Sequence, residues 1–312
     1  MQNLIFSINV VLPLFLIMCL GTFLRKIKIF DEKFLRTANS FTFKVLLPAL
    51  LFNNIYKSDI SDTFNPKLVI FAVSTVLIII LLLVITVPKF EKNNKNRGVL
   101  IQAMFRSNYV LFGIPLCTNI FGESSTGITS MLIAVIVPLY NFMSVIILDI
   151  YSKEEIRIGE TLGDVARNPL ILASLTGIAV SVLNIKLPVA FDRTISDIAK
   201  IATPLALMIL GGEFEISNVY KNIKYIVTSS LVKLVLVPSV VIPAAVMAGF
   251  RGVELGTLFS MVSAPVAVSS FTMAQHCDAN YELAGQIVFI TTILSSLTIF
   301  MFIYILKSLC LF

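Results

Sequence analysis

The sequence has few charged residues and no long polar segment, which argues against a soluble protein. Of its 312 residues only 13% are charged, none is tryptophan, one is histidine, and 57% are hydrophobic. Soluble domains carry about 25% charged residues, and the mean hydropathy here is +0.93. We therefore expect an all-α polytopic membrane protein, in which each spanning helix needs roughly 20 apolar residues.

Cysteine and histidine are also scarce, which leaves little for a metal or redox site. The four cysteines (Cys19, Cys117, Cys277 and Cys310) fall within apolar runs, at spacings unlike those of metal or redox motifs. We expect no metal and no cofactor. The 24 Lys and Arg outnumber the 18 Asp and Glu, but they cluster between apolar runs, where basic residues set membrane topology. We therefore expect no nucleic-acid partner.

Ten apolar runs of spanning length follow one another along the chain. They cover residues 4–24, 35–56, 67–88, 98–121, 127–149, 169–185, 195–213, 222–248, 254–275 and 283–306. The first run has no basic leader and no small-residue cleavage site, so we interpret it as a retained helix and not a signal peptide. The polar stretch at 151–167 is expected to be a cytoplasmic linker.

The two halves of the chain resemble each other. Matching motifs recur in chain order, shifted by 154 to 157 residues: Pro13-Leu14 with Pro169-Leu170, Phe34 with Phe191, Pro48 with Pro204, Pro88 with Pro243, and Arg97-Gly98-Val99 with Arg251-Gly252-Val253. We expect residues 1–150 and 168–312 to form two five-helix repeats. Because five is odd, the second repeat enters the membrane from the opposite side, and inverted repeats are typical of secondary transporters.

The basic residues predict the orientation. With the N-terminus outside, the cytoplasmic loops hold 14 of the 24 Lys and Arg and the outer loops hold 7. The positive-inside rule therefore favours a multi-pass protein of the cell membrane with both termini extracytoplasmic. Lys44, Arg106 and Lys233 lie within spans, and for the two lysines we expect the side chain to reach the polar interface.

Two spans contain a proline flanked by polar residues. Gly113-Ile114-Pro115 lies in the fourth span and Ala264-Pro265 in the ninth. A proline within a span frees backbone carbonyls, and paired broken spans indicate a binding site near the midplane. The half-helix N-terminus created there carries partial positive charge and suits an anion such as a carboxylate. We expect the two prolines to mark the breaks.

The polar residues near these prolines are candidate ligands for a small polar anion or a coupling cation. With one glycine, they are Arg106, Ser107, Asn108, Gly113, Asn141, Ser263, Ser269, Ser270 and Gln275. Each type has a structural alternative: an ion pair or snorkelling for Arg106, an interhelical hydrogen bond for Asn108, and close helix packing for the serines.

Several segments resemble the auxin efflux carrier family, over essentially the whole chain. They are RSNYVLFGIPL, VPLYNFMSVIILDIY, NPLILASLTGI, TPLALMILGGEF and APVAVSSFTMAQH. That family includes plant auxin exporters and bacterial permeases for malate, malonate and related acids, and it resembles the bile acid sodium symporters more distantly.

The resemblance implies ten helices in two inverted repeats, with the fourth and ninth crossing at Pro115 and Pro265. It also implies elevator-type movement against a scaffold of the first, second, sixth and seventh helices that dimerises, and contact between Asn108 and the substrate. The expected function is secondary active transport of a small organic anion such as malate or malonate, with H⁺ or Na⁺ as the candidate coupling ion.

Other functions need other features. A membrane-embedded sensor with a transporter fold and an exporter of auxin-like indole acids stay open as alternatives. The long central loop of the plant exporters is missing here, which favours a bacterial-type permease. An intramembrane enzyme would need a nucleophile–base pair or a metal cluster, and one histidine with scattered cysteines argues against it.

Overall fold

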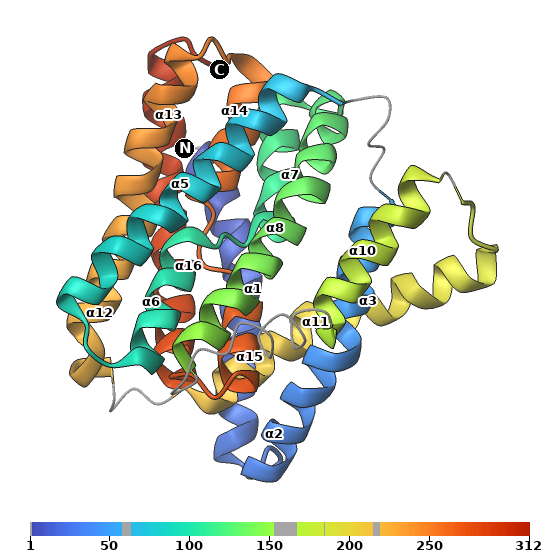
Figure 1. The fold of residues 1–312 in the computed structure, drawn as a ribbon, viewed down its shortest axis with the longest axis vertical. Helices are drawn as coiled ribbons and strands as arrows, with labels where there is room; N and C mark the ends of the chain where they lie inside the picture. Colours follow the sequence, from blue (N-terminus) through green and yellow to red (C-terminus); the bar gives the residue numbers. More distant parts are fainter. Residues whose placement is uncertain (1, 58–63, 153–166, 184, 215–218) are drawn as a thin grey trace.

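The computed structural model describes residues 2–57, 64–152, 167–183, 185–214 and 219–312, with side chains from residue 12 onward. Every regular element in these ranges is a helix (Figure 1). The linker expected at 151–167 falls mostly on 153–166, outside the described residues. The start of α1 and the C-terminus lie at the same end of the molecule in Figure 1.

Helices cover each of the expected apolar runs. In chain order they are α1 (Gln2–Lys26), α2 (Glu32–Phe41), η1 (Thr42–Leu46), α3 (Leu47–Tyr56), α5 (Pro66–Phe90), α6 (Asn94–Phe105), α7 (Tyr109–Phe121), η2 (Glu123–Ser125), α8 (Thr126–Ser152), α10 (Pro169–Val182), α11 (Val189–Glu213), α12 (Val219–Leu231), η4 (Val232–Leu236), α13 (Val237–Met247), α14 (Gly252–Ser263), α15 (Ser269–His276) and α16 (Tyr281–Ser308). The segments η1 and η4 are π-helical turns within longer helices.

Six helical stretches of the described chain are long and apolar enough to cross a membrane. They are Pro66–Phe90, Asn94–Phe121, Glu123–Ser152, Val189–Glu213, Val219–Met247 and Tyr281–Ser308. Helix α5 exposes large side chains such as Ile70, Ile78 and Leu81. Contiguous apolar surface of this kind is rare on soluble monomers, so the bilayer is its natural solvent.

Asparagine caps fix where several helices begin. Asn65, Asn93, Asn168 and Asn280 each accept a hydrogen bond from a backbone N–H in the first turn of α5, α6, α10 and α16. These bonds satisfy donors that a helix start otherwise leaves free. Pro66 and Pro169 occupy the first helical position, where a missing N–H costs nothing.

The helices form two groups, which contact each other chiefly where α1 packs on α16. The small group comprises α1, α2, η1, α3, α10 and α11, in which α1 packs on α11 and α3 packs on α10 and α11. The large group comprises α5 to α8 and α12 to α16, including η2 and η4, with α6 on α8, α7 on α14, and α12 and α15 on α16. In Figure 1, α3 and α10 stand to one side of the large group.

Glycine allows the closest approach within the small group. A Cβ on Gly21 would collide with the backbone of Met208 in α11, and one on Gly211 would collide with the backbone of Met18 in α1. Thr22 in α1 also donates to the Gly211 carbonyl at 2.7 Å. Small residues that let backbones touch are a typical way of joining helices in lipid.

Two helical spans are interrupted inside the large group. Helix α14 ends at Ser263 and α15 begins at Ser269, so the second break contains Pro265 as predicted. Helix α6 ends at Phe105 and α7 begins at Tyr109. We call residues 106–108 the first break and residues 264–268 the second break.

The predicted position of the first break, at Gly113-Ile114-Pro115, is wrong. Pro115 lies inside α7, which continues to Phe121, because one missing N–H removes only one hydrogen bond of the ladder. The chain leaves helical geometry earlier, at Arg106 and Asn108. There the N–H of Asn108 donates to the Pro265 carbonyl oxygen at 2.7 Å, so a tertiary bond replaces a helical one.

Candidate functional site

The two breaks touch in the interior, and a pocket opens beside them. Its cavity volume is about 60 Å³, several times the space that one water molecule needs. The lining residues are Leu47, Leu50, Leu51, Arg106, Ser107, Asn108, Tyr109, Val110, Leu111, Val137, Tyr140, Asn141, Leu170, Thr203, Ala206, Ala267, Val268 and Ser269. None of them is acidic.

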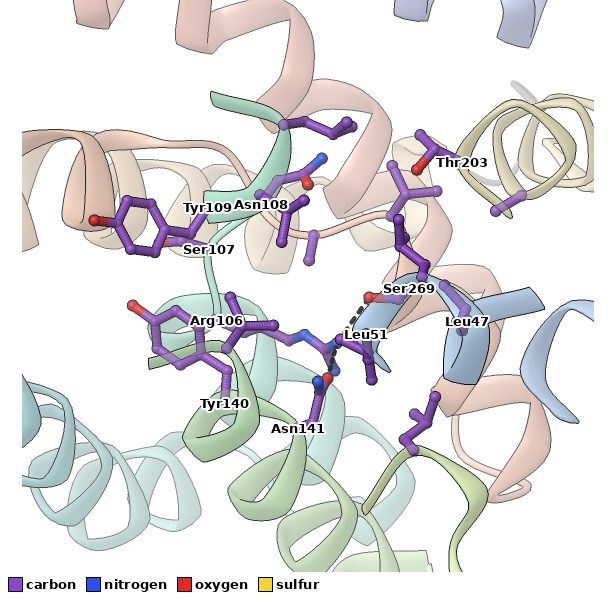
Figure 2. A pocket seen from close by; sticks show the side chains of 18 residues that line it. Leu47, Leu51, Arg106, Ser107, Asn108, Tyr109, Tyr140, Asn141, Thr203 and Ser269 are labelled. Atoms are coloured by element: carbon purple, nitrogen blue, oxygen red, sulfur yellow. Dashed lines mark hydrogen bonds between the residues drawn. The ribbon is translucent and has the colours of Figure 1, made fainter. Parts of the chain in front are cut away.

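The two helix groups contribute different walls to this pocket. The large group supplies Arg106, Asn108, Asn141 and most of the other polar side chains, whereas the small group supplies leucines, Ala206 and one hydroxyl, that of Thr203. Figure 2 shows Leu47, Leu51 and Thr203 on one side and Ser107, Tyr109 and Tyr140 on the other. The side chains that could bind a polar ligand therefore belong mainly to the large group of helices.

Arg106 is the central charged group of the pocket. Its Nη2 donates to Asn141 Oδ1 at 2.5 Å and to Ser269 Oγ at 2.7 Å (Figure 2), and its Nη1 contacts Met273 Sδ. The side chain thus links the first break to α8 and to the start of α15. Only 4% of the residue is exposed.

Neither structural alternative for Arg106 fits this geometry. No carboxylate forms an ion pair with it within the described ranges. Its burial and its inward contacts are also incompatible with snorkelling toward headgroups. A buried guanidinium without a counter-ion is costly, typically by several kcal/mol.

The side-chain amides of Asn108 and Asn141, near Arg106, each have a nitrogen that can still donate hydrogen bonds. A guanidinium can only donate, so the side-chain oxygen of Asn141 must face Arg106 and its Nδ2 must point elsewhere. Neither Asn141 Nδ2 nor Asn108 Nδ2 has a hydrogen-bond partner among the described residues. Tyr109, Val110 and Leu111 in the first turn of α7 also line the pocket, and free N–H groups at a helix N-terminus are a typical binding site for an anion.

Comparison with known proteins shows the family of the chain. A family model described as "Membrane transport protein" matches residues 6–303. The chain belongs to this family. It is the auxin efflux carrier family that the sequence resembles, and the chain is accordingly a multi-pass membrane transport protein.

Two curated relatives carry transporter names. A protein of Rhizobium meliloti named "Putative malonate transporter" is 29% identical over 148 residues, which is 46% of this chain and 45% of that protein. An uncharacterized transporter of Methanocaldococcus jannaschii is 21% identical over 312 residues, covering 96% of this chain and 99% of that protein. The second match therefore extends over nearly the whole of both sequences.

The pocket gathers some of the predicted ligands and leaves others outside. Those that line it are Arg106, Ser107, Asn108, Asn141 and Ser269; those that do not are Gly113, Ser263, Ser270 and Gln275. A Cβ on Gly113 would come within 2.8 Å of the Tyr109 ring, so that glycine serves packing. The Ser263 hydroxyl donates to the Phe259 carbonyl at 2.6 Å, a bond within its own helix.

The pocket wall formed by the small group was not among the residues predicted from the sequence, although one signal for it was present. The match of Pro48 with Pro204, shifted by 156 residues, also pairs Leu47 with Thr203 and Leu50 with Ala206. All four line the pocket. Extending the repeat from the prolines to their neighbours would have predicted this wall.

The expectation for Lys233 was wrong. Instead of reaching the interface, Lys233 is 1% exposed, and its Nζ donates to Ser107 Oγ and to the Val262 carbonyl, the latter at 3.3 Å. The π-helical turn η4 packs against α6, α14 and α16 and encloses the side chain. Lys44, in the other π-helical turn, is exposed.

Proposed function

We infer that this carrier is a secondary active transporter that moves a small organic anion, such as malonate or malate, across the cytoplasmic membrane. The observation that carries the proposal is the buried Arg106 guanidinium, which lines a mostly apolar pocket that contains several hydrogen-bond donors and no acidic residue. Arginine binds carboxylates with two parallel hydrogen bonds. A carboxylate there would supply the missing counter-ion.

A dicarboxylate fits the surroundings best. The name of the Rhizobium relative mentions malonate, and the free amides of Asn108 and Asn141 lie beside Arg106 for further carboxylate oxygens. Small-molecule sites are fixed by a few well-placed polar groups within a mostly apolar lining, which matches this pocket. We assign Asn108 and Asn141 to the substrate.

The architecture in this proposal is two inverted five-helix repeats, residues 1–150 and 168–312, whose broken fourth and ninth helices cross at the site. The paired positions Leu47 with Thr203 and Leu50 with Ala206 support it, since repeat-related residues meet at one pocket. In inverted-repeat transporters, broken helices bind the substrate and one body moves against the other.

Movement is proposed to be elevator-like, with the large group carrying the anion along the small group. The division of the pocket walls favours this, because the small group offers mainly apolar side chains over which a bound anion can slide. The small group would also form a homodimer interface, through exposed residues such as Leu172, Leu175 and Phe191. In this proposal both termini lie outside the cell.

The test is exchange of labelled malonate or malate by proteoliposomes loaded with the unlabelled acid. Wild-type exchange that a folded Asn108→Ala variant loses would support the proposal. Thr118→Val is the matched control, because Thr118 lies on α7 outside the pocket and donates within its own helix.

Other outcomes of the same assay identify the alternatives. Exchange of indole acids but not of malonate would favour an auxin-like exporter. No exchange of any carboxylate, with ligand-induced stabilisation intact, would favour a sensor and overturn the proposal.

A further inference from the structure

Lys233 is a second buried cation at the meeting point of the two breaks, and the proposed anion site does not use it. It lies on the π-helical turn η4, between α12 and α13. Turns of this kind are rare and often mark functional positions. An ionisable residue enclosed within a span is itself uncommon, because its charge is expensive in the bilayer.

The contacts of Lys233 join the two breaks. Ser107 lies in the first break and accepts a hydrogen bond from Lys233 Nζ, and Val262 lies in the last turn before the second break and accepts another through its carbonyl. Ser107 also lines the pocket. The ammonium therefore lies behind the pocket wall and contacts Ser107, the residue between Arg106 and Asn108.

The ligands of Lys233 are oxygens of the type that bind sodium. In secondary transporters, freed carbonyls at unwound helices coordinate a coupling Na⁺, and hard cations prefer hydroxyl and carbonyl oxygens. Here one hydroxyl and one carbonyl oxygen hold an ammonium that belongs to the chain. No carboxylate pairs with Lys233 in the part of the chain that the structure describes.

We propose that Lys233 is a built-in cation that takes the place of a diffusible coupling cation, holding the two breaks in their binding geometry so that anion exchange needs no Na⁺. The inference rests on the proposed function, since it concerns the same site. It makes Lys233 a positioning residue: it contacts Ser107 and Val262, not the anion. Because the charge is covalently fixed, the site is organised before the anion arrives.

The first test is the salt dependence of the wild-type protein. Anion exchange in proteoliposomes is expected to be equal in sodium, potassium and choline media of the same ionic strength. Exchange that requires Na⁺ would overturn the proposal. This arm needs no variant, so it stands even if substitutions at Lys233 impair folding.

The second test removes the ammonium. Lys233→Met should slow exchange by about a hundredfold, the scale expected when catalytic or binding groups shift by about 1 Å, whereas Lys233→Arg should retain more activity. Lys233→Ser leaves space for a cation where the ammonium was and adds a hydroxyl oxygen. Na⁺ should therefore restore anion exchange by this variant, whereas exchange by the wild type should not depend on Na⁺. Lys44→Met is the matched control, because Lys44 lies on a π-helical turn but is exposed.

A stability measurement separates this inference from the proposed function. Sodium should raise the Tm of detergent-solubilised Lys233→Ser by mass action and leave the wild-type Tm unchanged. If the wild type exchanges no carboxylate, the proposed function fails. The effect of sodium on the Tm would still test whether Lys233 takes the place of a cation. Full exchange by Lys233→Met, or a folded Lys233→Ser that ignores Na⁺ in both assays, would overturn the proposal.

Discussion

At the scale of single residues, the site is defined by what surrounds Arg106. The guanidinium is buried, donates to two neutral side chains and has no acidic partner in the described chain. The sequence predicted Arg106, Ser107, Asn108, Asn141 and Ser269 as candidate ligands, because polar residues in apolar spans are conspicuous, and all five line the pocket. It could not predict that Lys233 is enclosed, because its enclosure depends on helices distant in sequence.

Asn141→Asp should raise the thermal stability of the protein and weaken its binding of the anion. A carboxylate at this position would lie within reach of the Arg106 Nη2, now 2.5 Å from the amide oxygen. Breaking a buried ion pair costs about 3–5 kcal/mol, so completing one here should raise the Tm by several degrees. The same carboxylate neutralises Arg106, so affinity for a dicarboxylate should fall at least tenfold.

Thermal unfolding and equilibrium binding of the purified variant check both halves of this prediction. Asn141→Ala serves as the control that loses the hydrogen bond without adding charge. An Asn141→Asp protein that binds the anion as tightly as the wild type would contradict the assignment of Arg106.

At the scale of elements, the two breaks have different causes. The second contains Pro265, and the residue before it, Ala264, has φ −59° and ψ 145°, the extended geometry that a following proline imposes. The first contains no proline and depends on the bond from Asn108 to Pro265. Local sequence rules therefore predicted the second break and misplaced the first.

Pro265→Ala should impair exchange more than Pro115→Ala. The first substitution removes the restraint on Ala264 and allows α14 to extend, whereas the second replaces a proline within a continuous helix. We expect about a tenfold or greater loss for Pro265→Ala, since small displacements at a site reduce rates strongly. Exchange rates of both variants, normalised to folded protein, test this, and the reverse order would refute it.

Gly211→Leu should destabilise the small group. A side chain at this position meets the backbone of Met18, and overpacking costs about 1–3 kcal/mol or more. The Tm in detergent should fall by several degrees. Ala190→Leu, at an exposed position of the same helix, should leave the Tm close to that of the wild type; equal losses would argue against the close crossing.

At the scale of the whole molecule, the sequence predicted the helical content and the positions of the helices well. Apolar runs of spanning length identify helices, because a backbone within lipid must satisfy its own hydrogen bonds, as a helix does. The apolar runs alone did not predict which helices pack together, because packing of α1 on α11 and of α3 on α10 joins distant segments. The family resemblance did predict that the first, second, sixth and seventh helices belong together, and these are the helices of the small group. The division of the pocket between two groups follows from that packing.

Linking the two groups should stop transport if the elevator proposal is correct. The ring of Phe43 in η1 stacks on His276 in α15, with centroids 4.0 Å apart, so this contact joins the small group to the large one. Phe43→Cys with His276→Cys, in a background without the four native cysteines, should lose exchange on cross-linking with Hg²⁺ and regain it when excess dithiothreitol takes up the Hg²⁺.

Each single cysteine variant treated with Hg²⁺ is the control for this experiment. Full exchange by the cross-linked double variant would show that the two groups need not move at this contact.

The most direct measurement of the central claim is equilibrium binding of malonate to purified wild-type protein, Arg106→Gln and Arg106→Lys. Hydrogen bonds to charged groups contribute about 1.5–3 kcal/mol, so Arg106→Gln should bind roughly ten- to a hundredfold more weakly, and Arg106→Lys should be intermediate. A folded Arg106→Gln protein that binds malonate with wild-type affinity would contradict an anion site at Arg106.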